Sequence, residues 1–504
     1  MRSRYWQVVM LWLACCGLTA AQEPASKIDW NELNFTFGNG MRLEVGGYSL
    51  AGFYNAQSSP FVNNAATYTT SYGAGEVVGG FEPDGHGGFR PSSDFQKGDR
   101  IEDEYLRIRP WLHLYTSENL SFHTRFDVMT GTISRDITPH NRVDFLYADY
   151  LTHGIRIQAG MLPFNEPVHT EWHSAWGDPN TLVLAGNGGM GINSKANGDD
   201  DRHVAEGYEG VLVSTTDLLD PVALRFGYLD LGHSYFSDEL NLWTLEGIYR
   251  INDSARFKLY EYLVRDKKNT QYPGLGGDHS NSNYTGAYVQ KDPTPWGFTA
   301  NAIYLDGKTN LAEKSLNRDA GAAVLTLDYK LADGPSLGFM SNPQTGLKYA
   351  YSSGDNNPRD NKDNAWWGVD GEYVGSYMFF DYGWSFTYNY QLTAIDPNTG
   401  LKLGVQMLGP YLKTTIPWIS QNLTLDSGIY KLWATKASSE RFGGNGNRDV
   451  GTELDATLEY FITKHLSVMQ EMDYIFAGNL YNDRATGTRA ADPWKIGLFA
   501  FYYF

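Results

Sequence analysis

The sequence predicts an all-β fold, a transmembrane antiparallel β-barrel of about 18 to 20 strands. Three observations support this prediction. Apolar and polar residues alternate along segments of about ten residues, the period of a strand with one apolar and one wet face. Short polar turns and long polar connections separate these segments. The chain also ends in an alternating aromatic segment that closes on Phe504.

The composition excludes several other classes of protein. The 504 residues are 42% hydrophobic, 14% aromatic and 19% charged, with 54 Gly, a net charge of −18 and a mean hydropathy of −0.41. No tract is collagen-like or of uniformly low complexity, which excludes a fibre and a wholly disordered chain. No segment after the N-terminal region has the roughly 18 consecutive apolar residues that a membrane helix needs. We expect no nucleic-acid partner.

Residues 1–21 have the features of a secretory signal peptide. Arg2 and Arg4 begin it, an apolar stretch follows from Trp6 to Leu18, and small residues at 19–21 form the cleavage site. Both cysteines fall inside this leader, so the mature chain must fold without disulfides. We expect residues 22–504 to form one barrel in the outer membrane of a Gram-negative bacterium, with residues 22–40 as a periplasmic N-terminal segment.

Residues 105–114 give the clearest strand pattern. One face carries Leu106, Ile108, Leu112 and Leu114, and the other carries Arg107, Arg109 and His113. After the polar turn 117–119 the pattern returns, with Leu120, Phe122, Phe126 and Val128 opposite Ser121, His123, Arg125 and Asp127. Arg156 and Gln158 oppose isoleucines in the same way, as do Arg256 and Lys258 beside Phe257 and Leu259. A charge on the lipid side costs about 2 to 4 kcal/mol near the midplane, so these cations are expected to face inward.

The connections between strands fall into two groups. Short turns are expected at 153–154, 253–254, 292–295 and 463–465, and long connections at 56–100, 163–206, 265–282, 352–364 and 435–449. Short periplasmic turns and long extracellular loops are typical of outer-membrane barrels. A soluble β-sandwich or β-helix also alternates, but the aromatic strand ends, the number of strands and the last segment favour a barrel.

The last segment, residues 494–504, has apolar residues at every second position up to Phe504. It resembles the terminal strand of bacterial outer-membrane proteins. That resemblance implies that Phe504 is the signal recognised by the barrel-assembly machinery.

A second resemblance lies in the last third of the chain. It rests on Lys-Tyr-Ala-Tyr-Ser-Ser-Gly-Asp-Asn-Asn at 348–357, Gly-Thr-Glu-Leu-Asp-Ala-Thr-Leu-Glu-Tyr at 451–460, Leu-Ser-Val at 466–468 and Tyr-Ile-Phe-Ala-Gly at 474–478. These segments resemble the closing hairpins of the alginate-export family of outer-membrane porins. The resemblance implies a monomer of about 18 strands whose arginine-lined lumen passes an anionic sugar polymer. This chain departs from that description in being acidic overall.

A barrel of this size leaves an aqueous interior, so we expect a channel for hydrophilic solutes or anionic saccharides. The lumen-facing selectivity candidates are Arg107, Arg109, His113, His123, Arg125, Asp127, Arg156, Arg256 and Lys258. The alternative is a neutralised charge network that only stiffens the wall. The long connection 163–206 is expected to fold into the lumen as a constriction loop, with Trp172, His173 and Trp176 as its candidate residues.

Other motifs in the sequence give weaker evidence for a nucleotide, metal or calcium site. The glycine-rich run 186–191 is not followed by a helix-forming segment that could hold a pyrophosphate. His169, Glu171, His173 and His203 fit a polar loop better than a metal site, and we expect no resident cofactor. The acidic clusters 199–201 and 355–363 could hold calcium, although solvated loop charge is favoured.

No nucleophile motif marks an enzyme, so catalysis is not expected. A barrel hydrolase acting on lipid or peptide and a barrel that sheathes a partner protein stay open as alternatives. The expected partners are the outer-membrane lipids, including lipopolysaccharide, and the transported solute.

Overall fold

The computed structural model describes residues 33–37, 40–57, 81–83, 89–91, 100–132, 140–162, 208–215, 219–230, 240–252, 254–267, 279–293, 295–311, 314–331, 340–357, 359–366, 394, 396, 401–482, 484, 487, 489, 492 and 494–504. The expected leader at 1–21 and the expected constriction loop at 163–206 lie outside these residues. Among the described residues, no helix has the length and apolar composition needed to cross a bilayer.

Regular structure in the described chain is almost entirely β. The strands are β1 (Leu33–Thr36), β2 (Arg42–Gln57), β3 (Phe81–Pro83), β4 (Phe89–Pro91), β5 (Arg100–Tyr115), β6 (Leu120–Thr132), β7 (His140–Thr152), β8 (Ile155–Leu162), β9 (Tyr208–Thr215), β10 (Val222–Asp230), β11 (Leu240–Asn252), β12 (Ala255–Asp266), β13 (His279–Lys291), β14 (Trp296–Asn310), β15 (Ser315–Lys330), β16 (Ser341–Ser352), β17 (Lys362–Asp363), β18 (Val405–Thr415), β19 (Leu423–Ala434), β20 (Asp449–Phe461), β21 (Leu466–Ala477) and β22 (Trp494–Tyr503). Two 3-10 turns, η4 (Glu440–Phe442) and η5 (Asn479–Tyr481), lie in the connections that follow β19 and β21.

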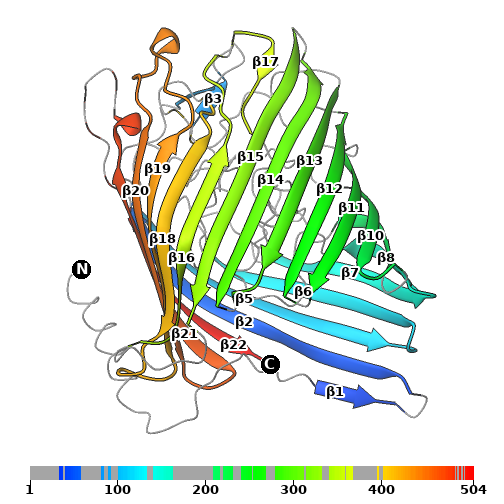
Figure 1. Ribbon diagram of the computed structural model, residues 1–504. Helices are drawn as coiled ribbons and strands as arrows, with labels where there is room; N and C mark the ends of the chain where they lie inside the picture. The colour runs from blue at the N-terminus through cyan, green and yellow to red at the C-terminus, as the bar shows by residue number, and fades with distance from the viewer. Residues whose placement is uncertain are drawn as a thin grey trace.

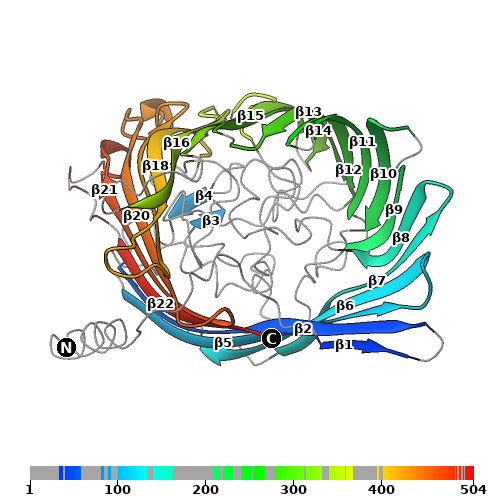
Figure 2. The ribbon, with the colours of Figure 1, turned by 60° about the horizontal axis from the view of Figure 1, so that its bottom comes forward.

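Eighteen of these strands close into an antiparallel barrel. The ring runs from β2 through β5 to β16 and then through β18 to β22, and each strand pairs with its neighbour in this order. β22 pairs with both β21 and β2, so the sheet has no free edge along the seam. Figure 2 shows the closed ring, with β2 and β22 side by side. The predicted fold class and the count of 18 are confirmed.

The predicted alternation is confirmed in the strands where it was clearest. On β5, Leu106 is exposed on the outside while Arg109 is buried on the inside. On β6, Phe122 and Phe126 are exposed, whereas Arg125 is buried. The outside of the ring is therefore apolar and the inside polar, as a membrane barrel requires.

The seam is made by the two ends of the barrel sequence. Beyond β22, the backbone N–H of Gly47 donates to the carbonyl of Phe504 at 2.7 Å, and the N–H of Phe504 donates to the carbonyl of Gly47 at 2.9 Å. A Cβ on Gly47 would lie 2.6 Å from the carbonyl oxygen of Arg109, so only glycine fits this close approach. Below Gly47, toward the start of β2, β1 pairs with the same edge of β2 that β22 pairs with above it. Leu33 and Phe35 of β1 are exposed.

The two ends of the barrel differ in their connections. The end that carries the C-terminus and β1 has the short turns, and we call it the turn end (Figure 1). The opposite end, where β17 lies, has the long connections and is called the loop end. By the asymmetry of outer-membrane barrels, the turn end faces the periplasm and the loop end faces the exterior.

Two expected loop boundaries are wrong. The connection expected at 265–282 is shorter, because β12 continues to Asp266 and β13 begins at His279. These strand ends carry polar residues on both faces, so hydropathy does not alternate there. The connection expected at 352–364 is longer and reaches β18 at Val405. Within it β17 pairs in parallel with β15, where Asn317 and Arg318 face Lys362 and Asp363.

Candidate functional site: the inner wall of the barrel

The sequence-predicted cations divide into buried and accessible groups. Arg109 and Arg125 are buried, and the guanidinium of Arg125 lies over the ring of Phe145 at 4.9 Å. Arg156 and Arg256 are exposed on the inner face near the turn end. Arg107 and Asp127 lie in β5 and β6, but their side chains are outside the described part of the structure.

His113 and His123 belong to a stack of rings on the inner face of β5 to β7. Their ring centroids are 4.5 Å apart, Trp111 stacks on His113 at 4.6 Å, and Tyr147 stacks on His123 at 4.9 Å. The ring of His123 also forms a 2.8 Å hydrogen bond with Ser121 through Nε2. These contacts cross three strands and hold both imidazoles against the wall.

Arg156 is fixed by a carboxylate from the neighbouring strand. Its Nε donates to both oxygens of Asp149, at 2.9 and 2.8 Å, and its Nη2 also contacts Asp149. Gln158 donates to the same carboxylate at 3.3 Å. The guanidinium is therefore oriented but still half exposed to the lumen.

Glu246 is the centre of a second network, on β10 to β12. Its carboxylate is fully buried and accepts hydrogen bonds from Arg225 at 2.7 Å and from the hydroxyl of Tyr262 at 2.5 Å. Lys258 lies 3.7 Å away. The sequence pattern identified Lys258 but missed Glu246 and Arg225. Arg225 alternates with Leu224 and Phe226, a signal that could have found it, whereas Glu246 shares its face with Leu242 and Ile248.

A third charged region, on β18 to β21, was not predicted as a site. Lys413 pairs with Asp426 at 3.0 Å. Four further carboxylates on the inner face of β20 and β21 are buried: Glu453, Asp455, Glu471 and Asp473. In the sequence these carboxylates occupy alternate positions along each strand, a pattern that could have predicted an acidic inner face. Because acidic residues gather in this region, an acidic chain can still carry cations on the wall elsewhere.

In five inward-facing pairs of Lys or Arg with a carboxylate of the wall, the cation is the more exposed partner; in a sixth, Arg250 with Asp220 of a turn, the two side chains are about equally exposed. The exposed fractions of cation and carboxylate are 49% and 15% for Arg42 and Glu44, 49% and 6% for Arg156 and Asp149, 26% and 0% for Arg225 and Glu246, 8% and 0% for Lys258 and Glu246, and 32% and 14% for Lys413 and Asp426. A solute in the lumen therefore meets guanidinium and ammonium groups, while the carboxylates lie behind them.

At the loop end a cluster of buried apolar side chains joins the inner wall. Buried side chains there include Leu229, Leu242, Leu305, Val405 and Ile475. Residues of the connections join the same cluster, notably Trp366, Leu403 and Leu480. Trp366 packs edge-on against inward-facing Tyr284 with ring centroids 5.8 Å apart, so it lies on the lumen side of the wall. The sequence did not single out Trp366, and its candidates Trp172, His173 and Trp176 lie outside the described residues.

Polar contacts bind the loop-end connections to one another. The side-chain amide of Asn445 donates to the carbonyls of Asn479, Leu480 and Asn482 at 2.8 to 3.2 Å. The hydroxyl of Ser438 donates to buried Asp396 at 2.6 Å. These contacts hold the connection between β16 and β18 and the connections that follow β19 and β21 close together.

Burial also affects two charged side chains in these connections. It lowers the pKa of Lys402 well below the ordinary lysine value; nearby Asp363 opposes this shift, and Arg318 adds to it. Burial raises the pKa of Asp355, although two backbone N–H groups oppose the shift.

The acidic segment 355–363 uses its carboxylates within the loop. Asp355 accepts backbone N–H groups from Asn357 at 2.8 Å and from Asn364 at 3.1 Å, and Asp363 accepts one from Ala365. Among the described residues, no group of three or more His, Cys, Asp or Glu side chains is placed to hold a metal ion. The segments 169–173 and 199–203 lie outside the described residues.

A closed 18-stranded ring with an apolar outer face and a charged inner face defines an outer-membrane channel of the β-barrel class. The family model described as alginate export matches residues 237–492, which is just over half of the chain. The chain belongs to this family.

Comparison with solved structures agrees on the fold. The chain is similar to Pseudomonas aeruginosa OccK8 (OprE), with 11% identity, a TM-score of 0.50, and coverage of 93% of this chain and 99% of that one. OccK11 (OpdR) from the same organism is similar at 12% identity and a TM-score of 0.48, covering 94% of this chain and 99% of that one. No curated protein shows significant sequence similarity to the chain.

Proposed function

We propose that this channel passes hydrophilic solutes through the outer membrane with a preference for anionic saccharides. The observation that carries the proposal is that the cation is more exposed than the carboxylate in the five inward-facing pairs given above. The family's description, alginate export, agrees with an anionic sugar as the solute.

The chemistry of the exposed groups suits transient binding. A guanidinium offers a planar fork of donors to a carboxylate or sulfate on a sugar. In water such contacts are weak, about 0 to 1 kcal/mol for exposed pairs, so a solute is guided and then released. The carboxylate behind each guanidinium fixes its direction without facing the solute. Under this proposal the chain is a channel and not an enzyme.

The test is ion selectivity in planar bilayers. Replacing Arg42, Arg156 and Arg256 with Gln removes three exposed inner cations and should shift the reversal potential in asymmetric salt toward cation preference. The matched control replaces Arg265, Lys308 and Lys431, which are cations on the outer face, and should keep the parent's value. If the lumen triple variant kept the parent's anion-to-cation permeability ratio, the anion preference would be ruled out and the channel would be a general-diffusion pore.

The export and the membrane assembly of the chain are also proposals. We propose export by a leader at residues 1–21 and recognition of Phe504 by the barrel-assembly machinery. Both rest on the sequence pattern, and the position of Phe504 at the barrel seam supports the second.

A further inference from the structure

The outer face of β11 to β15 continues past the apolar belt. Along β14 the outward side chains are Trp296, Phe298, Ala300, Ala302 and Tyr304, and then Asp306 and Lys308. The stretch from Trp296 to Tyr304 has the length of a transmembrane β-strand, about 9 to 11 residues, and an aromatic residue stands at each end. Asp306 and Lys308 are therefore above the hydrocarbon, at the level of the outer-leaflet headgroups.

Strand register places a row of polar side chains next to one another across these strands, oblique to the membrane because barrel strands are tilted. The cross-strand partners run in order Asn241, Arg265, Asn281, Lys308 and Asn317. We call these five residues the polar row. Since all five are on the outer face, their side chains are directed at the surrounding leaflet and not at the lumen.

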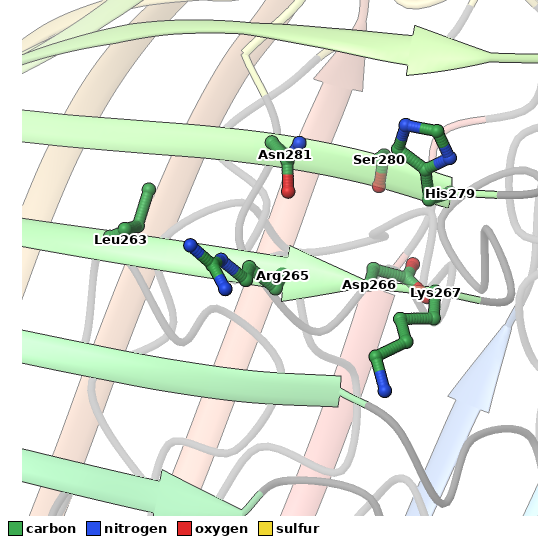
Figure 3. A pocket seen from close by; sticks show the side chains of 7 residues that line it. All are labelled: Leu263, Arg265, Asp266, Lys267, His279, Ser280 and Asn281. Carbon is green, nitrogen blue, oxygen red and sulfur yellow. The ribbon is translucent and has the colours of Figure 1, made fainter.

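A cavity of about 630 Å³ opens at the loop ends of β12 and β13, beside the middle of the polar row. Arg265 and Asn281 line it from neighbouring strands, with Lys267 and His279 at the strand ends and Leu263 farther along β12 from the strand end (Figure 3). Asp266 also lines the cavity, but it is buried on the inward side of β12.

The charge of the row is not cancelled by ion pairs. Within the described chain, no carboxylate is within ion-pair distance of Arg265 or Lys308. The carboxylates of this face stand nearer the belt: Glu261 on β12, Asp306 on β14, and Asp319 on β15, which accepts a hydrogen bond from the hydroxyl of Tyr304 at 3.1 Å. The upper edge of the face therefore presents cations and amide donors, with acidic groups between them and the apolar belt.

We infer that the polar row and its cavity bind the phosphorylated saccharide headgroup of an outer-leaflet glycolipid, lipopolysaccharide. Guanidinium and ammonium groups are the side chains that bind phosphate, and Arg does so bidentately. The asparagines supply donors and acceptors for sugar hydroxyls. Below them Trp243, Leu245 and Leu259 continue the face as an apolar surface for acyl chains. This inference goes beyond transport, because the site is on the outer wall.

The test compares lipopolysaccharide binding by two double variants. R265Q/K308Q removes both unpaired cations of the row. R250Q/K330Q removes two exposed cations that face inward near the turn end, and it is the control for net charge. Delipidated, folded protein is titrated with deep-rough lipopolysaccharide in detergent and followed by native mass spectrometry. R265Q/K308Q should bind at least about tenfold more weakly, because charge-assisted contacts are lost, and the control should match the parent.

Three further binding measurements identify the molecule that binds the polar row. R265K/K308R keeps both charges and should bind nearly as well as the parent. Lipopolysaccharide stripped of its lipid phosphates should bind the parent as weakly as the intact lipid binds R265Q/K308Q. Inorganic phosphate in excess should not displace the lipid. Binding of R265Q/K308Q equal to that of the parent, indifference to lipid phosphorylation, or displacement by inorganic phosphate would each overturn the assignment.

Discussion

At the scale of single residues, buried carboxylates on the inner wall hold cations that are more exposed than they are. Glu246 shows the reason most clearly. A buried carboxylate is costly unless its oxygens are paired, and Glu246 contacts Arg225, Lys258 and Tyr262. Because Arg225 is partly exposed while Glu246 is fully buried, the network keeps a positive group toward the lumen with its carboxylate behind it.

Removing Glu246 should therefore destabilise the barrel and not merely change its selectivity. Glu246→Ala leaves Arg225 and Lys258 without their carboxylate, which costs about 3 to 5 kcal/mol in the free energy of unfolding when a buried pair is broken. Urea titration of the protein in bilayers would measure the change. Tyr262→Phe, which removes only one hydrogen bond to Glu246, should cost less, about 1 to 3 kcal/mol. An unchanged unfolding midpoint in Glu246→Ala would show that the network does not hold the wall.

At the scale of elements, the seam between β2 and β22 is completed by a pair of backbone hydrogen bonds, those between Gly47 and Phe504. The ring of Phe504 also stacks near Tyr502, with centroids 6.2 Å apart. The terminal residue therefore contributes both a backbone and a side chain to closure, and the two contributions can be separated.

Deleting Phe504 should lower the folded, heat-modifiable fraction more than Phe504→Ala does. The deletion removes both seam hydrogen bonds and exposes backbone groups that cost about 1 to 3 kcal/mol each when left unpaired. The alanine variant keeps them and loses only the ring. Deletion of Gly487, an exposed loop residue, is the control and should assemble as the parent does. Equal defects in the deletion and the alanine variant would assign the effect to the ring alone.

Alternation predicted the elements that face lipid on one side and the lumen on the other. It located β5, β6, β8 and β12 and the inward direction of Arg109, Arg125 and Arg156. It could not show that Arg109 and Arg125 are buried while Arg156 is half exposed, because burial depends on neighbouring strands. It also failed at the loop ends of β12 and β13, where both faces are polar, and at Trp366, whose position comes from tertiary packing.

At the scale of the whole molecule, the interior changes character from one end to the other. Near the turn end the wall carries exposed cations such as Arg42 and Arg156. At the loop end it carries a cluster of buried apolar side chains that packs against residues of the connections, Trp366 among them. Apolar side chains that line an open water-filled lumen would be exposed, whereas these are buried. We therefore infer that the segment carrying Trp366 narrows the channel from the loop end.

Trp366→Ala should raise single-channel conductance in planar bilayers. Trp366 is fully buried and contacts Tyr284 on the wall, so its removal leaves a large cavity at the narrowing and loosens the segment 353–366 that holds it. The matched control is Trp418→Ala, a highly exposed tryptophan in a turn at the other end, which should conduct as the parent does. Because Trp366 carries no charge, the reversal potential should stay near the parent's value while conductance rises. Conductance equal to the parent's in Trp366→Ala would show that this segment packs on the wall without limiting the pore.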